Sequence, residues 1–174
     1  NDCNNNLNTL GKLSIRDLEQ YKGIGSAKAI TILAACELGK RRQKATVEEA
    51  PILNSAENIY QFMHTTIQDL DIEEGWVLMM KQNFRLIEAK RISVGGLTMA
   101  PVDLRLMMKE VLLKNTTVLA FCHNHPSGST NPSRDDDILT SHIHKACELL
   151  HIHFADHVIL ADGGYFSYRE EGKL

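Results

Sequence analysis

The sequence predicts an α/β fold in which helices pack against a mostly central sheet, preceded by a small helical unit. The first observation is that helix-like and strand-like apolar patterns alternate along most of the chain. The second is length, because 174 residues suffice for one domain with a substantial core and a small appendage. The third is composition, since 43% hydrophobic and 24% charged residues are ordinary for a globular protein.

The N-terminal part of the chain has the pattern of a short helical hairpin. Residues 1–12 are polar and rich in asparagine, so we expect them to be loose. Two helices follow, joined by a tight turn at Gly23 and Gly25, since glycine adopts positive φ without a steric penalty. We therefore expect a helical unit and a linker within residues 1–50, and the main domain within residues 51–174.

In the main domain, apolar spacing and turn signals predict each element in turn. Ser55 is suited to cap a helix, and Gln82 with Asn83 can turn one strand into the next. The expected elements are a helix over 55–70, strands over 76–80 and 84–93, a helix over 102–113, a strand over 117–121, a helix over 134–150, a strand over 153–161 and a last strand ending near 168. The exposed edge of such a sheet often pairs, so an oligomer is one expected form.

Composition also excludes several classes of protein. The formal net charge of -3 is not the signature of a chain that binds nucleic acid with its whole surface, so any basic patch must be local. No apolar run approaches the roughly 20 residues needed to span a bilayer, so we expect no membrane partner. The four cysteines form no CxxC pair, which favours reduced thiols in a cytoplasmic protein. The chain opens at Asn1 and has no basic-then-apolar leader, which suggests a fragment or a processed chain.

The most informative stretch of sequence lies around His123 and His125. Side chains alternate between the two faces of a strand, so these two imidazoles point the same way. Pro126 then ends the strand because it cannot donate a ladder hydrogen bond. Ser133 is a good helix N-cap, and Asp136 three residues later falls in the first helical turn, where it can face the histidines.

This residue set has the chemistry of a catalytic zinc site. Two histidines and one carboxylate leave one coordination position for water, whereas structural zinc sites are closed by four protein ligands. Zinc would lower the pKa of that water to about 7 and so produce hydroxide at neutral pH. We therefore expect one Zn²⁺ per chain, held by His123, His125 and Asp136.

The same residues carry a family resemblance. His-x-His, seven residues, Ser, two residues and Asp is the signature of the JAMM (MPN-plus) metalloproteases, and His123, His125, Ser133 and Asp136 match all of it. The fuller string HNHPSG followed by PSRDD resembles the bacterial RadC family, a branch of that superfamily. The segment DHVI with the GG and FS that follow it is also similar to the end of RadC proteins. The resemblance covers nearly the whole chain from about residue 13.

The resemblance implies a fold, an activity and further site residues. The fold would be a cytidine-deaminase-like three-layer α/β/α sandwich. The activity would be zinc-dependent hydrolysis of a peptide or isopeptide bond in a protein or peptide substrate, with a link to DNA repair suggested by the family name. A glutamate before the first strand would act as general base. Glu73 and Glu74 are both candidates, and matching the following hairpin to the family pattern favours Glu73. Ser133 would stabilise the oxyanion, or only cap the helix.

The glycine turn near the N-terminus resembles a helix-hairpin-helix element. Such a turn can direct backbone N–H groups at a DNA phosphate, and Lys22 and Lys28 would add charge around Gly23 and Gly25. The alternative is a plain helical hairpin with glycines for close packing. This element motivates a second hypothesis, a non-catalytic DNA-associated or partner-binding module. A metal-dependent nuclease ranks third, because one zinc differs from the usual two-metal sites for phosphoryl transfer.

The remaining histidines are expected to lie outside the zinc site. His142 and His144 fall in a predicted helix, where a two-residue step spans about 200°, so they cannot share a ligand face. His151 and His153 flank a helix-to-strand junction without a returning carboxylate, which favours a surface position. His157 could hydrogen-bond to a metal ligand without binding the metal itself, although a structural hydrogen bond is the commoner role.

Overall fold

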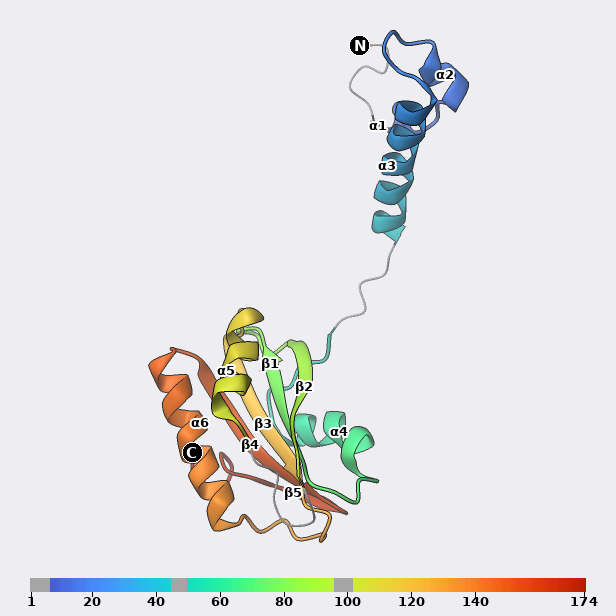
Figure 1. Ribbon diagram of the computed structural model, residues 1–174. Coiled ribbons are helices and arrows are strands. Elements are labelled where there is room, and N and C mark those ends of the chain that lie inside the picture. The colour runs from blue at the N-terminus through green and yellow to red at the C-terminus, as the bar shows by residue number, and fades with distance from the viewer. Residues whose placement is uncertain (1–6, 45–49, 96–101) are drawn as a thin grey trace. The chain divides into compact units, whose positions relative to one another are not determined.

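The computed structural model describes residues 7–44, 50–95 and 102–174. The chain divides into two compact units, Asn1–Glu49 and Ala50–Leu174 (Figure 1). No helix within the described ranges is long and apolar enough to cross a membrane.

The first unit contains the helices α1 (Leu7–Leu10), α2 (Ile15–Glu19) and α3 (Ser26–Lys44). The predicted loose start is wrong for residues 7–10, which form α1, while residues 1–6 lie outside the described residues. Ser14 caps α2 in a capping box with Asp17, which satisfies backbone N–H groups that a helix start leaves open.

The second unit is built on one sheet, and five strands of the described residues form it in the order β2-β1-β3-β4-β5. Only β3 and β4 pair in parallel, and the other neighbouring strands are antiparallel. The β3–β4 connection runs through α6, as a parallel pair requires a crossover. The strands are β1 (Glu74–Met80), β2 (Leu86–Val94), β3 (Val118–Asn124), β4 (His153–Ala161) and β5 (Gly164–Ser167).

Helices cover both faces of this sheet, so the predicted three-layer α/β/α sandwich is confirmed (Figure 1). Helix α4 (Ala56–Ile67) covers one face, while α5 (Leu104–Leu113) and α6 (Arg134–Leu149) cover the other. Each face has its own apolar core, because alternate residues of the buried strands point to opposite sides. Every residue of β3 is buried, which makes this strand a rigid base for whatever its end carries.

Two differences from the expected elements bear on function. Strand β1 begins at Glu74, two residues before the expected start, and β3 extends to Asn124, three residues beyond the expected end. Because these strands are longer, the predicted site residues Glu73, His123 and His125 lie at or directly beside strand ends.

Candidate metal centre

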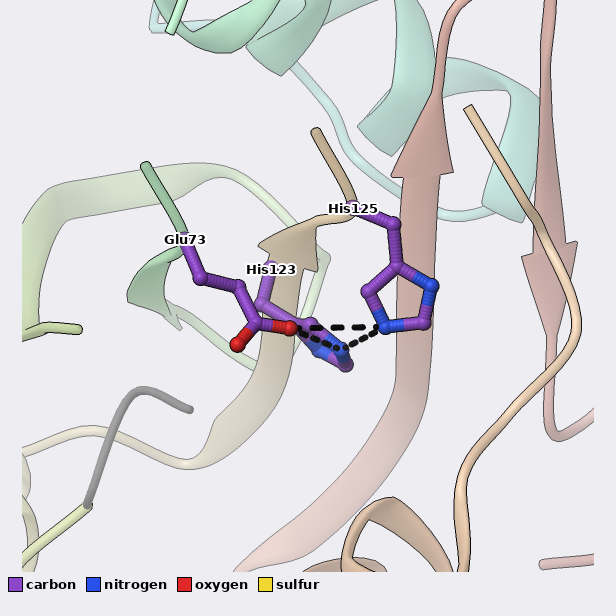
Figure 2. Close-up of side chains that lie close together, drawn as sticks. All are labelled: Glu73, His123 and His125. Carbon is purple, nitrogen blue, oxygen red and sulfur yellow. Dashed lines mark hydrogen bonds and ion pairs between the residues drawn. The ribbon is translucent and has the colours of Figure 1, made fainter. Parts of the chain in front are cut away.

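Two imidazoles converge at the end of strand β3. His123 is the penultimate residue of that strand and His125 follows its end, so both rings project from the face covered by α5 and α6. Their Nε2 atoms lie 3.0 Å apart (Figure 2). Both side chains are largely withdrawn from solvent. The strand therefore presents two nitrogen donors to one point, as the two-residue spacing predicts.

The carboxylate of Asp136 approaches this pair from helix α6. Its Oδ1 lies 3.1 Å from Nε2 of His123, and its Oδ2 lies 3.6 Å from Nε2 of His125. Burial alone would raise the pKa of Asp136, but the hydrogen bonds with His123 and His125 outweigh burial and hold that pKa well below its usual range. Asp136 is therefore an ionised oxygen donor at the centre.

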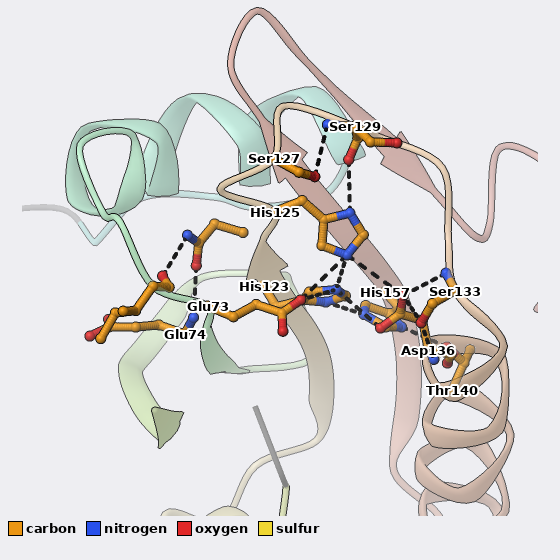
Figure 3. A network of polar contacts seen from close by, with 12 residues as sticks. Glu73, Glu74, His123, His125, Ser127, Ser129, Ser133, Asp136, Thr140 and His157 are labelled. Carbon is orange, nitrogen blue, oxygen red and sulfur yellow. Dashed lines mark hydrogen bonds and ion pairs between the residues drawn. The ribbon is translucent and has the colours of Figure 1, made fainter. Parts of the chain in front are cut away.

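The position of Asp136 depends on the start of α6. Ser133 is the N-cap residue, and its backbone N–H and hydroxyl both donate to Oδ2 of Asp136 at 2.7 Å. The Ser133 hydroxyl oxygen accepts in return from the Asp136 backbone N–H at 3.2 Å. The single hydroxyl proton of Ser133 is thus engaged by Asp136. In this arrangement Ser133 caps the helix and orients the carboxylate (Figure 3).

A second carboxylate reaches the pair from the residue just before β1. Oε1 of Glu73 lies 3.5 Å from Nε2 of His125 and 3.9 Å from Nε2 of His123 (Figure 2). Glu74, the alternative, has its side chain elsewhere, because it accepts from Trp76 Nε1 at 3.1 Å and from Arg91 Nη1 at 2.6 Å. Of the two glutamates, Glu73 is the one whose carboxylate lies at the histidines.

The outer nitrogens of both rings have partners that fix the state of the inner ones. Nδ1 of His125 lies 2.8 Å from the carbonyl oxygen of Ser129. A carbonyl can only accept, so Nδ1 carries the proton and Nε2 of the neutral ring is a free lone pair. His123 is held from behind by His157 at 2.9 Å. Two Nε2 lone pairs facing each other at 3.0 Å would repel, and either a proton on one ring or a cation bound by both would relieve that repulsion.

The donor spacings fit a tetrahedral metal. Ligands about 2.0–2.1 Å from zinc at tetrahedral angles are separated from one another by about 3.3 Å. The two Nε2 atoms are 3.0 Å apart, and Asp136 lies near that edge length from each of them through different oxygens, Oδ1 at 3.1 Å from His123 and Oδ2 at 3.6 Å from His125. Glu73, His123 and His125 form an overlapping set, with donor atoms within 4.8 Å of one another. Asp136 and Glu73 are therefore two carboxylates within reach of the histidine pair.

The family model described as a RadC-like JAB domain matches residues 53–173. This chain belongs to the RadC-like JAB domain family. A UPF0758 protein of Flavobacterium johnsoniae is 39% identical over 167 residues, covering 96% of this chain and 73% of that protein. A UPF0758 protein of Porphyromonas gingivalis is 35% identical over 172 residues, covering 98% of this chain and 76% of that protein.

A cavity opens beside the centre of this RadC-like domain. Its volume is about 470 Å³, and His125 and Pro126 form part of its wall. Segments from α4, from the end of β4 and from the loop before β1 complete the lining, which includes Asp69, Asp71 and Asp162. A ligand in this cavity would therefore contact His125.

The other paired histidines of the RadC-like domain lie apart from the centre. His142 and His144 are exposed on α6, and His151 and His153 are exposed around the start of β4. None of these four belongs to a group of convergent donors among the described residues. Of the three His-x-His pairs, His123 and His125 are thus the pair that belongs to a group of convergent donors among the described residues.

Two supporting residues could not be recognised from the sequence. Thr140 contacts His157 behind the metal-facing residues, and Asn124 contacts the backbone on both sides of Glu73. Both contacts join elements far apart in sequence, so no local pattern signals them. For Asn124, the one available signal was its position between two histidines of a strand, which placed it on the opposite face.

The residues predicted to contact DNA lie in the first unit. Gly23 has a φ of +87° in the turn between α2 and α3, and Lys22 is exposed beside it. The Lys28 ammonium group donates to the Gly23 carbonyl at 2.8 Å. Among the described residues, a Cβ at Gly23 or Gly25 would meet nothing within 4 Å, so close packing is not the reason for either glycine. Gly23 serves its positive φ, and Gly25 leaves bare backbone at the start of α3.

Proposed function

We propose that this RadC-like domain is a zinc-dependent hydrolase that cleaves peptide or isopeptide bonds with an activated water. The observation that carries the proposal is the convergence of two imidazole Nε2 atoms and one carboxylate at spacings near a tetrahedral edge, with a second carboxylate in front of them. Three protein ligands leave a fourth position for water, which is the pattern of catalytic zinc sites.

Each residue has a role that follows from its position. His123, His125 and Asp136 would hold the ion, which when bound supplies the Lewis acidity that activates a water and polarises the scissile carbonyl. Glu73 is suited to accept the proton of that water and to deliver it to the leaving amine, because its carboxylate lies against the two Nε2 atoms. Ser133 orients Asp136. Its hydroxyl could serve as an oxyanion donor only by releasing Oδ2 of Asp136.

The first test is the metal content of the full chain. We expect one zinc per chain by elemental analysis, and loss of that zinc in His123→Ala. His142→Ala is the matched control, since this exposed histidine also belongs to a His-x-His pair. Absence of stoichiometric zinc from the unsubstituted protein, or retention of zinc by His123→Ala, would overturn the proposed metal site.

The second test separates ligand from base. Asp136→Asn should weaken zinc binding, whereas Glu73→Gln should keep zinc and abolish hydrolysis of peptide-linked and isopeptide-linked reporter substrates. If Glu73→Gln loses the metal and Asp136→Asn retains it, the overlapping set of Glu73, His123 and His125 is the ligand set instead.

We propose DNA contact through the helical hairpin as a second candidate function. The observation that favours it is the bare backbone at Gly25 at the start of the 19-residue helix α3, beside the exposed Lys22. Binding of duplex DNA by the full chain should weaken with salt and weaken further in Lys22→Ala. Lys28→Ala should act differently, by loosening the turn that its ammonium group holds at the Gly23 carbonyl. No binding at low salt would contradict this candidate.

A further inference from the structure

A buried chain of hydrogen bonds runs behind the ring of His123. Nδ1 of His123 lies 2.9 Å from Nε2 of His157, and Nδ1 of His157 lies 2.6 Å from the hydroxyl of Thr140. That hydroxyl also lies 2.6 Å from the backbone carbonyl oxygen of Asp136 (Figure 3). His157 is fully buried and Thr140 is 4% exposed, so water does not compete for these contacts.

The direction of every proton in this chain follows from its last member. The Asp136 carbonyl can only accept, so the single hydroxyl proton of Thr140 is donated to it. The Thr140 oxygen must then accept from His157, which places the proton of a neutral His157 on Nδ1. Nε2 of His157 is left as an acceptor, so His123 donates from Nδ1. Nε2 of His123 is therefore the lone pair that faces the metal centre.

The surroundings keep His157 neutral and fixed in place. The ring of His157 is fully buried, which disfavours its charged form, and each of its two nitrogens contacts one member of the hydrogen-bond chain. The ring of Tyr168 stacks on it with centroids 4.8 Å apart and planes 7° from parallel. The Tyr168 hydroxyl donates to Asp137 at 2.9 Å, which anchors the stacked ring to helix α6.

The chain of hydrogen bonds also links two of the proposed metal ligands. His123 belongs to β3, His157 to β4, and Thr140 and Asp136 to α6. Starting at His123, the hydrogen bonds pass through His157 and Thr140 to the backbone of Asp136, whose side chain returns to His123 at 3.1 Å. The loop is closed, so Thr140 is connected to both proposed ligands.

We propose that Thr140 and His157 are positioning residues that select the metal-binding tautomer of His123. The proposal rests on the proposed role of His123 as a ligand. Without the Thr140 hydroxyl, Nδ1–H of His157 has no acceptor, and His157 shifts its proton to Nε2. That proton then points at Nδ1 of His123, which must become an acceptor and carry its own proton on Nε2. One missing hydroxyl thus places a proton on the atom that should bind the metal.

The chain offers a matched set of variants for the test. Thr140→Val removes the hydroxyl at constant shape, and Thr140→Ser restores it. Thr116→Val is the control, because Thr116 is a buried threonine whose hydroxyl has no hydrogen-bond partner among the described residues. Zinc affinity of the full chain is measured by chelator competition, and ligand geometry by the visible absorption of bound Co²⁺. Losses at residues that support metal ligands are typically about 10- to 100-fold, which we expect for Thr140→Val.

The other outcomes follow from the same logic. Thr140→Ser should recover most of the affinity and the Co²⁺ spectrum, and Thr116→Val should match the unsubstituted protein. The proposal is overturned if folded Thr140→Val binds zinc normally, if Thr140→Ser is as weak as Thr140→Val, or if Thr116→Val loses as much affinity.

A second readout does not involve the metal. Long-range ¹H–¹⁵N correlation spectra of the metal-free protein should show His157 protonated on Nδ1, and protonated on Nε2 in Thr140→Val. Loss of the signal in His157→Gln assigns it. If the unsubstituted protein binds no zinc but this switch is seen, the proposed function fails while the hydrogen-bond chain stands. If zinc binds and His157 keeps one tautomer in both proteins, the hydrogen-bond chain is overturned and the proposed function stands.

Discussion

The side chain of Asn124 holds the backbone on either side of Glu73. Its Oδ1 accepts from the Glu74 backbone N–H at 2.8 Å, and its Nδ2 donates to the Ile72 carbonyl at 2.9 Å. The Glu73 carbonyl accepts in addition from the Gly95 N–H at 2.8 Å. Strand alternation sends His123 and Asn124 to opposite faces, so one strand end supplies a proposed metal ligand and also positions the proposed base.

Asn124→Ala should therefore loosen the segment that carries Glu73. The change leaves a buried N–H and a carbonyl without partners, and each lost partner of this kind costs about 1–3 kcal/mol. We expect a lower free energy of unfolding in urea and faster hydrogen exchange at the Glu74 amide. Asn54→Ala, at an exposed asparagine, is the control and should change neither quantity. Unchanged exchange at Glu74 in Asn124→Ala would contradict the assigned role.

Gly75, between Glu74 and Trp76, occupies a position in β1 that has no room for a methyl group. A Cβ there would lie 2.4 Å from Ser93 Oγ and 2.9 Å from the Phe121 ring. Gly75→Ala should cost about 1–3 kcal/mol, the usual range for overpacking. Ser93→Ala removes the nearer atom, and among the described residues that buried hydroxyl has no hydrogen-bond partner. The double variant should therefore recover part of the loss, which a double-mutant cycle of urea unfolding measures. Simple additivity of the two changes would contradict this contact.

Zinc affinity should depend on pH through His125. Its hydrogen bond with Asp136 is the largest cause that raises the pKa of His125 above the ordinary 6.5. A proton on Nε2 competes with the metal, so affinity is constant above the raised pKa and falls below it by about tenfold per pH unit for one displaced proton. Because the pKa is raised, the decline should begin above pH 6.5. Competition assays over a pH series measure it, and an affinity that stays flat across this interval would contradict it.

The stability of the metal-free protein should move in the opposite direction with pH. A folded pKa above the unfolded value means that the protonated His125 stabilises the fold, fully below pH 6.5 and less as pH rises through the raised pKa. Asp136 has a lowered pKa, so its contribution is present above 3.8 and is lost only in acid. The free energy of unfolding in urea, measured without metal, should thus fall as pH rises above 6.5. Saturating zinc should remove that trend.

Much of the fold and the position of the imidazole pair could be predicted from local patterns. The step between His123 and His125, the stop at Pro126 and the cap at Ser133 are all short-range signals, and each corresponds to a local feature of the structure. The expected helix over 55–70 also begins as predicted, with Ser55 as its N-cap. Short-range rules work here because each of these features depends on a few adjacent residues.

The supporting contacts of the site could not be predicted in this way. The bond between Asn124 and Glu74 spans 50 residues of sequence, and that between His123 and His157 spans 34. Such contacts depend on strand register, and β1 contains register shifts that no periodicity reveals. The same register left Glu73 and Glu74 as alternatives, because a one-residue shift exchanges the two faces of a strand.

The neighbouring side chains of Glu73 and Glu74 point in different directions, Glu73 to the histidines and Glu74 to Trp76 and Arg91. Glu74 pairs with Arg91 at 2.6 Å, and its side chain is 5% exposed while that of Arg91 is 52% exposed. Breaking a fully buried pair costs about 3–5 kcal/mol, and the exposure of Arg91 reduces this to about 1–3 kcal/mol for Glu74→Gln. Glu73→Gln removes no such pair with Lys or Arg among the described residues, so its metal-free stability should change less.

For turnover of a reporter substrate the order should be reversed, since only Glu73 faces the histidines. Urea unfolding and turnover measured on both variants give the comparison. If Glu74→Gln is stable but inactive while Glu73→Gln stays active, Glu74 is the base, and the proposed mechanism is contradicted.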